Sequence, residues 1–322
     1  MESSRCWCGS TNSVIFNNDY MRCCDCQTIF KKEMPDSNTY NTDAYDADYW
    51  EKTMAAIYKE QNCQDIDDIL LLHFGERATY WVREILPFCK PNGNVLEIGC
   101  GMGSFSYLMK MLNFNVIATE VDPHWRDVLT KKLGITVVQN LDDASNHPYD
   151  IVAGFDVIEH FLDPLTVMKE LSEKTAPSGF FVIQTPLAPA NNTYEELLAS
   201  KDSFLRQLLP EQHMYLFSPQ ALKKILNICG FVDIVELPNI FPSDSFVIAS
   251  KTPIHRLEFD ALKQIYCSNP NTILPFSLVE NSRENSCKRM AGELANELQR
   301  IKNRVQQSKW CRIGKYLKLF KY

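Results

Sequence analysis

Residues 95–105 read VLEIGCGMGSF, and this stretch decides the fold. Its first four residues are typical of a buried β-strand, while apolar side chains over residues 105–112 recur at helical spacing. Three glycines, at 99, 101 and 103, separate the two segments. Glycine adopts positive φ and lets a ligand approach the backbone, so a glycine turn at a helix N-terminus suits a nucleotide-like ligand bound by main-chain N–H groups. The stretch therefore predicts a strand, a ligand-binding turn and a helix.

The pattern of strand followed by helix continues beyond this turn. The sequence predicts strands at 94–98, 115–119, 135–138, 150–155 and 179–184, with helices at 50–61, 65–87, 104–112, 123–133, 164–174, 194–208 and 218–229. Two further strands are expected in the segments FVDIVEL and SFVIAS. Such alternation implies an α/β fold, a doubly wound Rossmann-like sheet of seven strands, with its ligand beyond the carboxyl ends of the strands.

Composition and charge limit the classes of protein to consider. A chain of 322 residues that is 45% hydrophobic can bury the core of one large domain with appendages. No run approaches about 18 apolar residues and the N-terminus has no apolar signal core, which favours a cytoplasmic protein. The net charge of −7 divides into about −15 for residues 1–282 and +8 for the tail at 283–322. An acidic body is a poor general binder of nucleic acid, whereas the basic tail could meet an anionic surface.

The glycine turn differs from the usual dinucleotide-binding turn. That turn reads G-x-G-x-x-G, but here the spacing is G-x-G-x-G, with Glu97 two residues earlier. The next strand ends in Glu120, where a carboxylate can accept hydrogen bonds from both hydroxyls of a ribose. The alternatives are an NAD-binding domain and, for Glu120, a solvated acid at a helix start.

The segments VLEIGCGMG, ATEVDP and YDIVAGFDVIEHFLDP resemble the motifs of class I methyltransferases that use S-adenosyl-L-methionine (SAM). The resemblance implies a SAM-dependent methyltransferase, with Asp156 near the methionine end of the cofactor; an ordinary loop or N-cap acid is the alternative there. The cofactor-binding residues it implies are Glu97, Gly99, Gly101, Gly103, Glu120 and Asp156.

Two cysteine-rich stretches, CWCGS and RCCDCQTIF, lie in the first 30 residues. Four thiolates from two knuckles make a closed tetrahedral Zn²⁺ site that can fold a segment too short for its own core. We expect the zinc ligands to be Cys6, Cys8, Cys23 and Cys26. Cys24 competes for a place, because the first knuckle is one residue shorter than C-x-x-C. Free thiols or a redox pair are the alternatives.

The cysteine stretches, the linker YDADYW and the segment EQHMYLFSPQAL extend the resemblance over about residues 1–250, to methyltransferases of bacterial surface-polysaccharide and deoxysugar pathways. This resemblance implies an acceptor that is a sugar, a nucleotide-sugar or a lipid-linked glycan, methylated on oxygen, nitrogen or carbon. DVIEHFLDP also resembles small-molecule O-methyltransferases of quinone biosynthesis, which would need no zinc head. A non-catalytic SAM-fold adaptor is disfavoured by the intact glycines and Glu120. RNA methylation is disfavoured by the acidic body.

Methyl transfer is an in-line displacement at a sulfonium, so a base is needed only where the acceptor loses a proton. Two histidines are candidates for the catalytic base. The resemblance puts His213 near the acceptor pocket, and His160 should lie at the carboxyl edge of the sheet, nearer the sulfonium. The alternatives are a loop oriented by His160 and Glu159, and a structural His213. Four tyrosines, Tyr45, Tyr49, Tyr194 and Tyr215, could line the pocket or lie in the core.

The last residues, SKWCRIGKYLKLFKY, place apolar and basic side chains on different faces of a helix. Such a helix could lie peripherally on the inner face of an anionic membrane or dock on the acidic body. An apolar seam at 290–305 could pair two chains as a homodimer or pack back on the protein. The expected organisation is a zinc-binding cysteine head at 1–35, a linker and helical lead-in at 36–90, a SAM-binding domain at 91–252 and a basic helical tail at 253–322.

Overall fold

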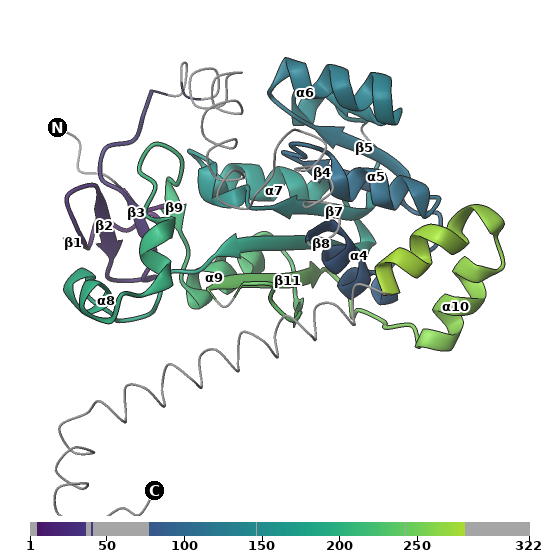
Figure 1. Cartoon of the computed structure of the whole chain (residues 1–322). Coiled ribbons are helices and arrows are strands. Elements are labelled where there is room, and N and C mark those ends of the chain that lie inside the picture. The colour runs from purple at the N-terminus through teal and green to yellow at the C-terminus, as the bar shows by residue number, and fades with distance from the viewer. Residues whose placement is uncertain (1–4, 37–39, 41–76, 146, 242, 281–322) are drawn as a thin grey trace, which may run out of the picture.

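The structure is a computed structural model in which residues 5–36, 40, 77–145, 147–241 and 243–280 are described. At its centre lies a seven-stranded sheet of strand order β10-β11-β8-β7-β4-β5-β6 (Figure 1). Five strands run parallel to one another: β4 (Asn94–Ile98), β5 (Asn115–Thr119), β6 (Thr136–Val138), β7 (Tyr149–Phe155) and β8 (Thr175–Pro186). At one edge β11 (Asp244–Ser250) runs antiparallel to β8, and β10 (Asp233–Glu236) antiparallel to β11. The predicted doubly wound, seven-stranded α/β fold is confirmed.

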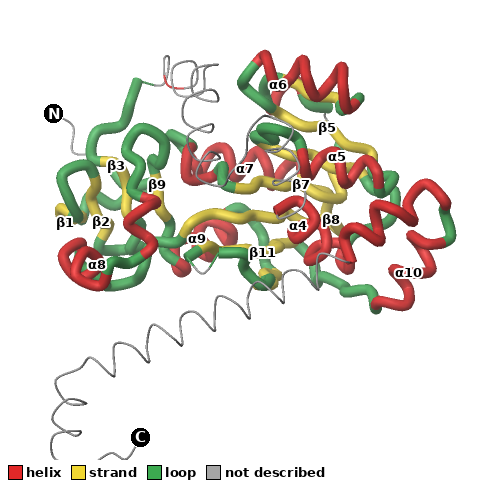
Figure 2. The backbone as a smooth tube through the Cα atoms, in the orientation of Figure 1, coloured by secondary structure: helices red, strands yellow, loops and turns green. Residues whose placement is uncertain are grey.

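Helices cover both faces of this sheet. Consecutive residues of each central strand point to opposite faces, so both sets of side chains are buried. Leu96 and Val152 join the core beneath α7 (Pro164–Lys174) and α9 (Pro219–Ile228). Their neighbours Val95 and Ile151 join the core beneath α4 (Thr79–Ile85), α5 (Ser104–Met111) and α10 (Phe259–Cys267). Figure 2 shows the strands in the middle of the molecule with helices around them. Apolar burial on two faces thus holds the carboxyl ends of the strands in a fixed row.

Two of the predicted helices are shorter in the structure, and each is followed by a turn of a different helical type. The helix expected at 123–133 is α6 (Pro123–Val128) followed by a π-helical turn over Leu129–Leu133. The helix expected at 194–208 ends as α8 (Tyr194–Ser200), because Lys201 adopts a left-handed φ of 54°. The Asp202 side chain then accepts a hydrogen bond from Phe204 N and starts a separate 3-10 turn.

The cysteine head forms a second, smaller sheet that the sequence pattern did not predict. Its strands β1 (Ser13–Ile15), β2 (Tyr20–Cys23) and β3 (Ile29–Lys31) are antiparallel. The fourth strand, β9 (Tyr215–Leu216), comes from almost 200 residues later and pairs with β3. Figure 1 shows the purple head strands beside the green β9. The head is therefore joined by main-chain hydrogen bonds to the segment that follows His213.

Several expectations lie outside the described residues. They concern Tyr45, Tyr49, the helix at 50–61, most of the helix at 65–87, the seam at 290–305 and the basic tail, and they stay predictions, as do the four segment boundaries. Within the part of the chain that the structure describes, no helix is both long and apolar enough to span a membrane.

Candidate active site

A cavity of about 720 Å³ opens at the carboxyl ends of the parallel strands. The residues that end β4, β5, β7 and β8 all border it. Seven of the predicted site residues line its wall: Glu97, Gly99, Gly101, Glu120, Asp156, His160 and His213. Gly103 is not among the lining residues, although its neighbour Ser104 is. The candidate cofactor and acid–base residues therefore share one cavity, as expected for parallel strands whose carboxyl ends meet at one sheet edge.

Two of the glycines in the turn are required by the protein's own packing. Gly99 has a φ of +59°, and a Cβ there would lie 2.4 Å from Cγ2 of Val157. Gly103 has a φ of +68°, and a Cβ there would lie 2.7 Å from Cδ2 of Leu129. Residues other than glycine rarely adopt this left-handed backbone conformation, so replacing either glycine would strain the backbone. Room for a ligand is therefore not the only reason for glycine here.

Glu120, which follows β5, is hydrogen-bonded to the glycine turn. One carboxylate oxygen accepts from Gly101 N at 2.7 Å and the other from Asp122 N at 2.9 Å. The side chain is only 5% exposed, and burial raises its pKa while these N–H donors oppose the rise. Each carboxylate oxygen has a second lone pair. The geometry is therefore compatible with the expected acceptance of ribose hydroxyls.

Glu97 ties β4 to α5. Its Oε2 accepts from both the backbone N–H and the hydroxyl of Ser106, the former at 3.1 Å. Burial raises the pKa of this carboxyl to about 8, although the bonds from Ser106 oppose the rise. Glu97, Gly99, Gly101 and Glu120 are called the glycine side of the cavity below.

Asp156 belongs to a carboxylate network that was only partly predicted. It adopts a left-handed φ of 53° and forms an ion pair with Arg77, whose guanidinium lies 5.2 Å from the Trp81 ring. Gln184 Nε2 donates to Asp156 at 3.1 Å and to Asp244 at 3.2 Å, and its Oε1 accepts from Trp81 Nε1 at 2.6 Å. Burial, reinforced by Asp156, raises the pKa of Asp244 to about 7, while Arg77 opposes the rise.

The two candidate bases lie together. The rings of His160 and His213 are 4.9 Å apart. Their Nδ1 atoms lie 2.8 Å from the carbonyl oxygen of Gln212 and 2.7 Å from that of Gln207, respectively. A carbonyl oxygen only accepts, so Nδ1 carries the proton and Nε2 is the basic nitrogen of each neutral ring. Burial lowers the pKa of both histidines, and His213 lowers that of His160 further, so both are neutral near pH 7.

Glu159 completes this group. It is only 1% exposed, and its Oε2 accepts from the Thr185 hydroxyl at 2.9 Å. Burial raises its pKa well above the usual range, and Asp156 adds to the rise. One ligand atom from each of Glu159, His160 and His213 lies within 4.8 Å of the others, a donor set that could move a proton or hold a metal. Together with the carboxylate network, these three residues are called the histidine side of the cavity.

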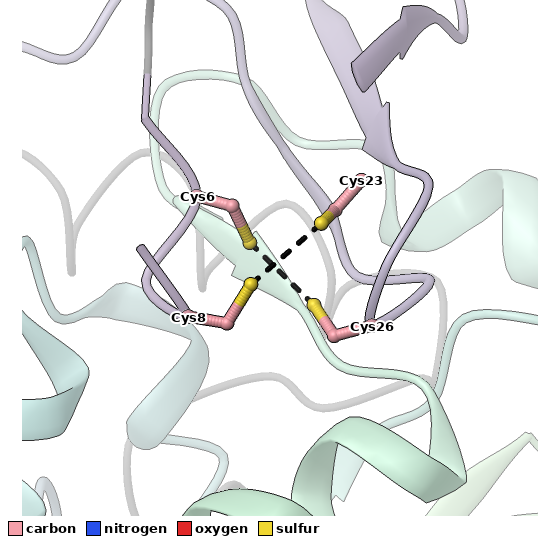
Figure 3. A group of neighbouring side chains, drawn as sticks. All are labelled: Cys6, Cys8, Cys23 and Cys26. Carbon is pink, nitrogen blue, oxygen red and sulfur yellow. Dashed lines mark hydrogen bonds between the residues drawn. The ribbon is translucent and has the colours of Figure 1, made fainter. Parts of the chain in front are cut away.

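The four predicted zinc ligands converge in the cysteine head (Figure 3). Sγ of Cys6 lies 3.6 Å from that of Cys26, Sγ of Cys8 lies 3.7 Å from that of Cys23, and all four sulfurs lie within 4.8 Å of one another. Tetrahedral Zn²⁺ with bonds of about 2.3 Å would separate its sulfurs by about 3.8 Å. The donor set therefore fits Zn²⁺, and Cys24 is not part of it.

The remaining aromatic candidates lie away from the cavity. Tyr194 packs edge-on against Phe16, and Tyr215 stacks on Phe30. Neither lines the cavity, whereas Tyr40 does. Sequence reasoning missed Tyr40, Arg77, Trp81, Gln184 and Asp244 as site residues. For Gln184 a signal was available, because it lies near the carboxyl end of a predicted parallel strand.

Comparisons with known proteins find methyltransferases. A ubiquinone biosynthesis O-methyltransferase from Cereibacter sphaeroides is 31% identical over 101 residues, which are 28% of this chain and 40% of that protein. One from Caulobacter sp. is 28% identical over 149 residues, which are 41% of this chain and 56% of that protein. The chain thus spans about half the length of the curated relatives it matches.

Among solved structures, a SAM-dependent methyltransferase from Thermotoga maritima is 13% identical with a TM-score of 0.44, over 63% of this chain and 99% of that one. Magnesium protoporphyrin IX methyltransferase from Synechocystis is 15% identical with a TM-score of 0.43, over 66% of this chain and 97% of that one. The family model described as "Methyltransferase domain" matches residues 72–236, just over half of the sequence. The chain therefore belongs to the methyltransferase domain family.

Proposed function

We propose that this protein is a SAM-dependent O-methyltransferase that methylates a ring hydroxyl. The observation that carries the proposal is the shared cavity, with the glycine turn and Glu120 on one side and two neutral histidines on the other. SAM, when bound, supplies an electrophilic methyl group. The glycine side would hold the nucleoside part, through Glu120 and the backbone of Gly101, and Asp156 the methionine part.

On the histidine side, His213 Nε2 would take the proton of the acceptor hydroxyl as the new O–C bond forms and the C–S bond breaks. The products are a methyl ether and S-adenosylhomocysteine, and the proton stays on the imidazole until it is released to solvent. His160 and Glu159, which each offer an atom within 4.8 Å of His213, would orient it. A neutral imidazole is the form that this step needs, and burial favours it.

For the acceptor, a hydroxyl on an aromatic ring is the better supported choice. The cavity wall includes the rings of Trp81, Phe155, Phe161 and Phe241, an apolar lining against which a planar acceptor could pack. The similar proteins named ubiquinone biosynthesis O-methyltransferase favour the same class. A sugar hydroxyl is the second candidate, favoured by the cysteine head beside the segment that carries His213.

The cysteine head would bind one Zn²⁺ through Cys6, Cys8, Cys23 and Cys26. Four protein ligands leave no open position on the metal, so its role would be structural. Contact of the basic tail with an anionic membrane and pairing of two chains are further proposals that rest on the sequence alone.

The test starts with calorimetric titration of zinc-assayed protein with SAM and, separately, NAD; we expect binding of SAM only, with one zinc per chain. Transfer of labelled methyl groups from SAM is then measured with alkyl-substituted catechols and with nucleotide sugars. Replacing His213 with Gln should lower kcat at least about 100-fold and change the Kd for SAM less than about twofold. His124→Gln, on the surface helix α6, is the control. Full turnover by both H213Q and H160Q would exclude histidine as the base.

A further inference from the structure

The segment that carries His213 is built against the cysteine head. Directly after His213, the backbone continues the sheet of the head: Leu216 pairs with Ile29 and Tyr215 with Phe30. Lys31 N donates to Met214 O at 2.9 Å, which extends the pairing to the residue next to His213. Main-chain hydrogen bonds of this kind fix the position of the backbone, and therefore the Cα from which the imidazole projects.

Side chains near the head hold the same segment from its N-terminal end. The hydroxyl of Tyr20, a fully buried residue of β2, donates to the carbonyl oxygen of His213 at 3.1 Å. The hydroxyl of Tyr40 donates to the carbonyl oxygen of Gln212 at 2.9 Å. That same carbonyl oxygen accepts from Nδ1 of His160. The position of Gln212 therefore affects both histidines.

The other flank of the segment rests on the turn that carries Glu159 and His160. Met214 N donates to the carbonyl oxygen of Glu159 at 2.8 Å. The segment thus lies between the head and this turn. Without the head it would keep this bond and the bonds of His213 N to Leu209 O and of Ala188 N to Phe217 O, each 2.8 Å, but would lose its pairing with β3 and its bond to Tyr20. By contrast, Glu97 and Glu120 bond to Ser106 in α5, to Gly101 in the glycine turn and to Asp122, the N-cap of α6, none of which contacts the head through these bonds.

The cysteine-rich part of the head packs against the residues that follow β9. The carbonyl oxygen of Cys26 accepts from the Ser218 hydroxyl at 2.7 Å, and Trp7 packs against Phe217 with ring centroids 6.1 Å apart. Cys6, Cys23 and Cys26 are buried in the same core as Phe217. Strands of three or four residues cannot stay ordered on their own. A metal on the cysteines would therefore add to the rigidity that apolar packing gives the head, and β3 and Tyr20 would transmit it to His213.

We infer that the cysteine head positions His213 for catalysis, through the strand β3 and the positioning residue Tyr20. Binding of a metal to the four cysteines therefore governs the turnover of the acceptor and leaves the affinity for SAM unchanged. This inference rests on the proposed function for its kinetic consequences. Its structural consequence, a local coupling between the head and residues 212–218, is measurable without any acceptor.

The first experiment compares hydrogen exchange in the zinc-loaded full chain and after zinc removal by a chelator. We expect faster exchange in peptides that cover 20–31 and 212–218, unchanged exchange at 94–119, and a Kd for SAM within about twofold of that of the loaded protein. Zinc added back should restore protection. Unchanged protection at 212–218 would overturn the inference, and so would a loss of protection throughout the large sheet, since the metal would then stabilise the whole fold.

The second experiment keeps the metal and removes one hydroxyl, in the variant Tyr20→Phe. We expect kcat to fall about threefold to tenfold with little change in the KM for SAM, and the acid limb of the pH–rate profile to move, because His213 would sit in an altered environment. The control is Tyr149→Phe, which removes a hydroxyl that bonds to Ser145 O at the amino end of β7. Identical kinetics and pH profiles in Y20F and Y149F would exclude Tyr20 as a positioning residue. If no acceptor is turned over, the proposed function fails, but the exchange experiment still decides the coupling.

Discussion

The glycine side and the histidine side of the cavity are assembled in different ways. The glycine side comes from one stretch of eleven residues and from the end of the next strand, and its carboxylates bond to the glycine turn, to α5 and to the start of α6. The histidine side combines residues 77, 156, 184 and 244 with the turn at 159–160 and with His213, whose segment pairs with the head. On the proposed function, the nucleoside part of the cofactor is bound by a local part of the fold, whereas Asp156 and the acceptor site depend on contacts between distant segments.

The largest effect on stability is expected from Gly99→Ala, on the glycine side. The added methyl group would lie 2.4 Å from Cγ2 of Val157 in a left-handed backbone conformation. Strain and overlap together should cost about 3 kcal/mol of unfolding free energy and weaken SAM binding at least about tenfold. Urea unfolding and calorimetry measure the two effects.

Val157→Ala provides the control for this substitution, because it removes the Cγ2 methyl group that the added Cβ at position 99 would meet. The double variant should recover the part of the loss due to overlap and keep about 1 kcal/mol from the backbone conformation. Strict additivity of the two single changes would show that contact with Val157 is not the reason for glycine here.

The next effect concerns Glu120→Ala, which removes the acceptor of the Gly101 and Asp122 N–H groups. We expect the Kd for SAM to rise about 100-fold, because both the ribose acceptor and the order of the turn are lost. Asp122→Ala is the matched control: it removes the N-cap of α6, whose side chain accepts from His124 N, and should cost about 1 kcal/mol of stability. Equal losses of SAM affinity in the two variants would contradict a direct role for Glu120.

The contrast between the two sides also explains which parts of the structure could be predicted from the sequence. Strands 94–98 and 115–119 were predicted with their observed bounds, because buried parallel strands leave short apolar runs between turns. The strands of the head were missed, since three or four residues beside cysteines show no periodicity.

The carboxylate network was missed for a different reason. Gln184 and Asp244 meet because β11 pairs antiparallel with β8, in a register that joins Asp244 to Pro186. Strand order and register are set by the packing of the whole sheet, and no local pattern at either residue indicates them. His160 and His213 were both predicted as candidates, but their proximity follows from contacts between segments far apart in the sequence, those of Met214 with Glu159 and of Gln212 with His160.

The smallest effect is expected from Asp244→Asn. This substitution tests how much unfolding free energy the protein loses when the buried Asp244 carboxyl ionises. Burial raises the pKa of Asp244 to about 7 in the folded protein, so its carboxyl keeps a proton that the unfolded chain releases near pH 4. Stability from this group is complete below about pH 4 and is lost as the pH rises towards 7. The amide of Asn cannot ionise, and its oxygen can still accept from Gln184.

Stability of D244N relative to the wild type should therefore improve by about 1 to 2 kcal/mol between about pH 5.5 and pH 7, as measured by urea unfolding at both values. His160 and His213 act in the opposite direction, because their lowered pKa values make the fold more stable as the pH rises. Both proteins contain these histidines, so their contribution cancels in the difference. A difference that stays constant with pH would mean that Arg77 keeps Asp244 ionised throughout. The histidine side would then be electrostatically balanced, and its dependence on distant segments would be a matter of geometry alone.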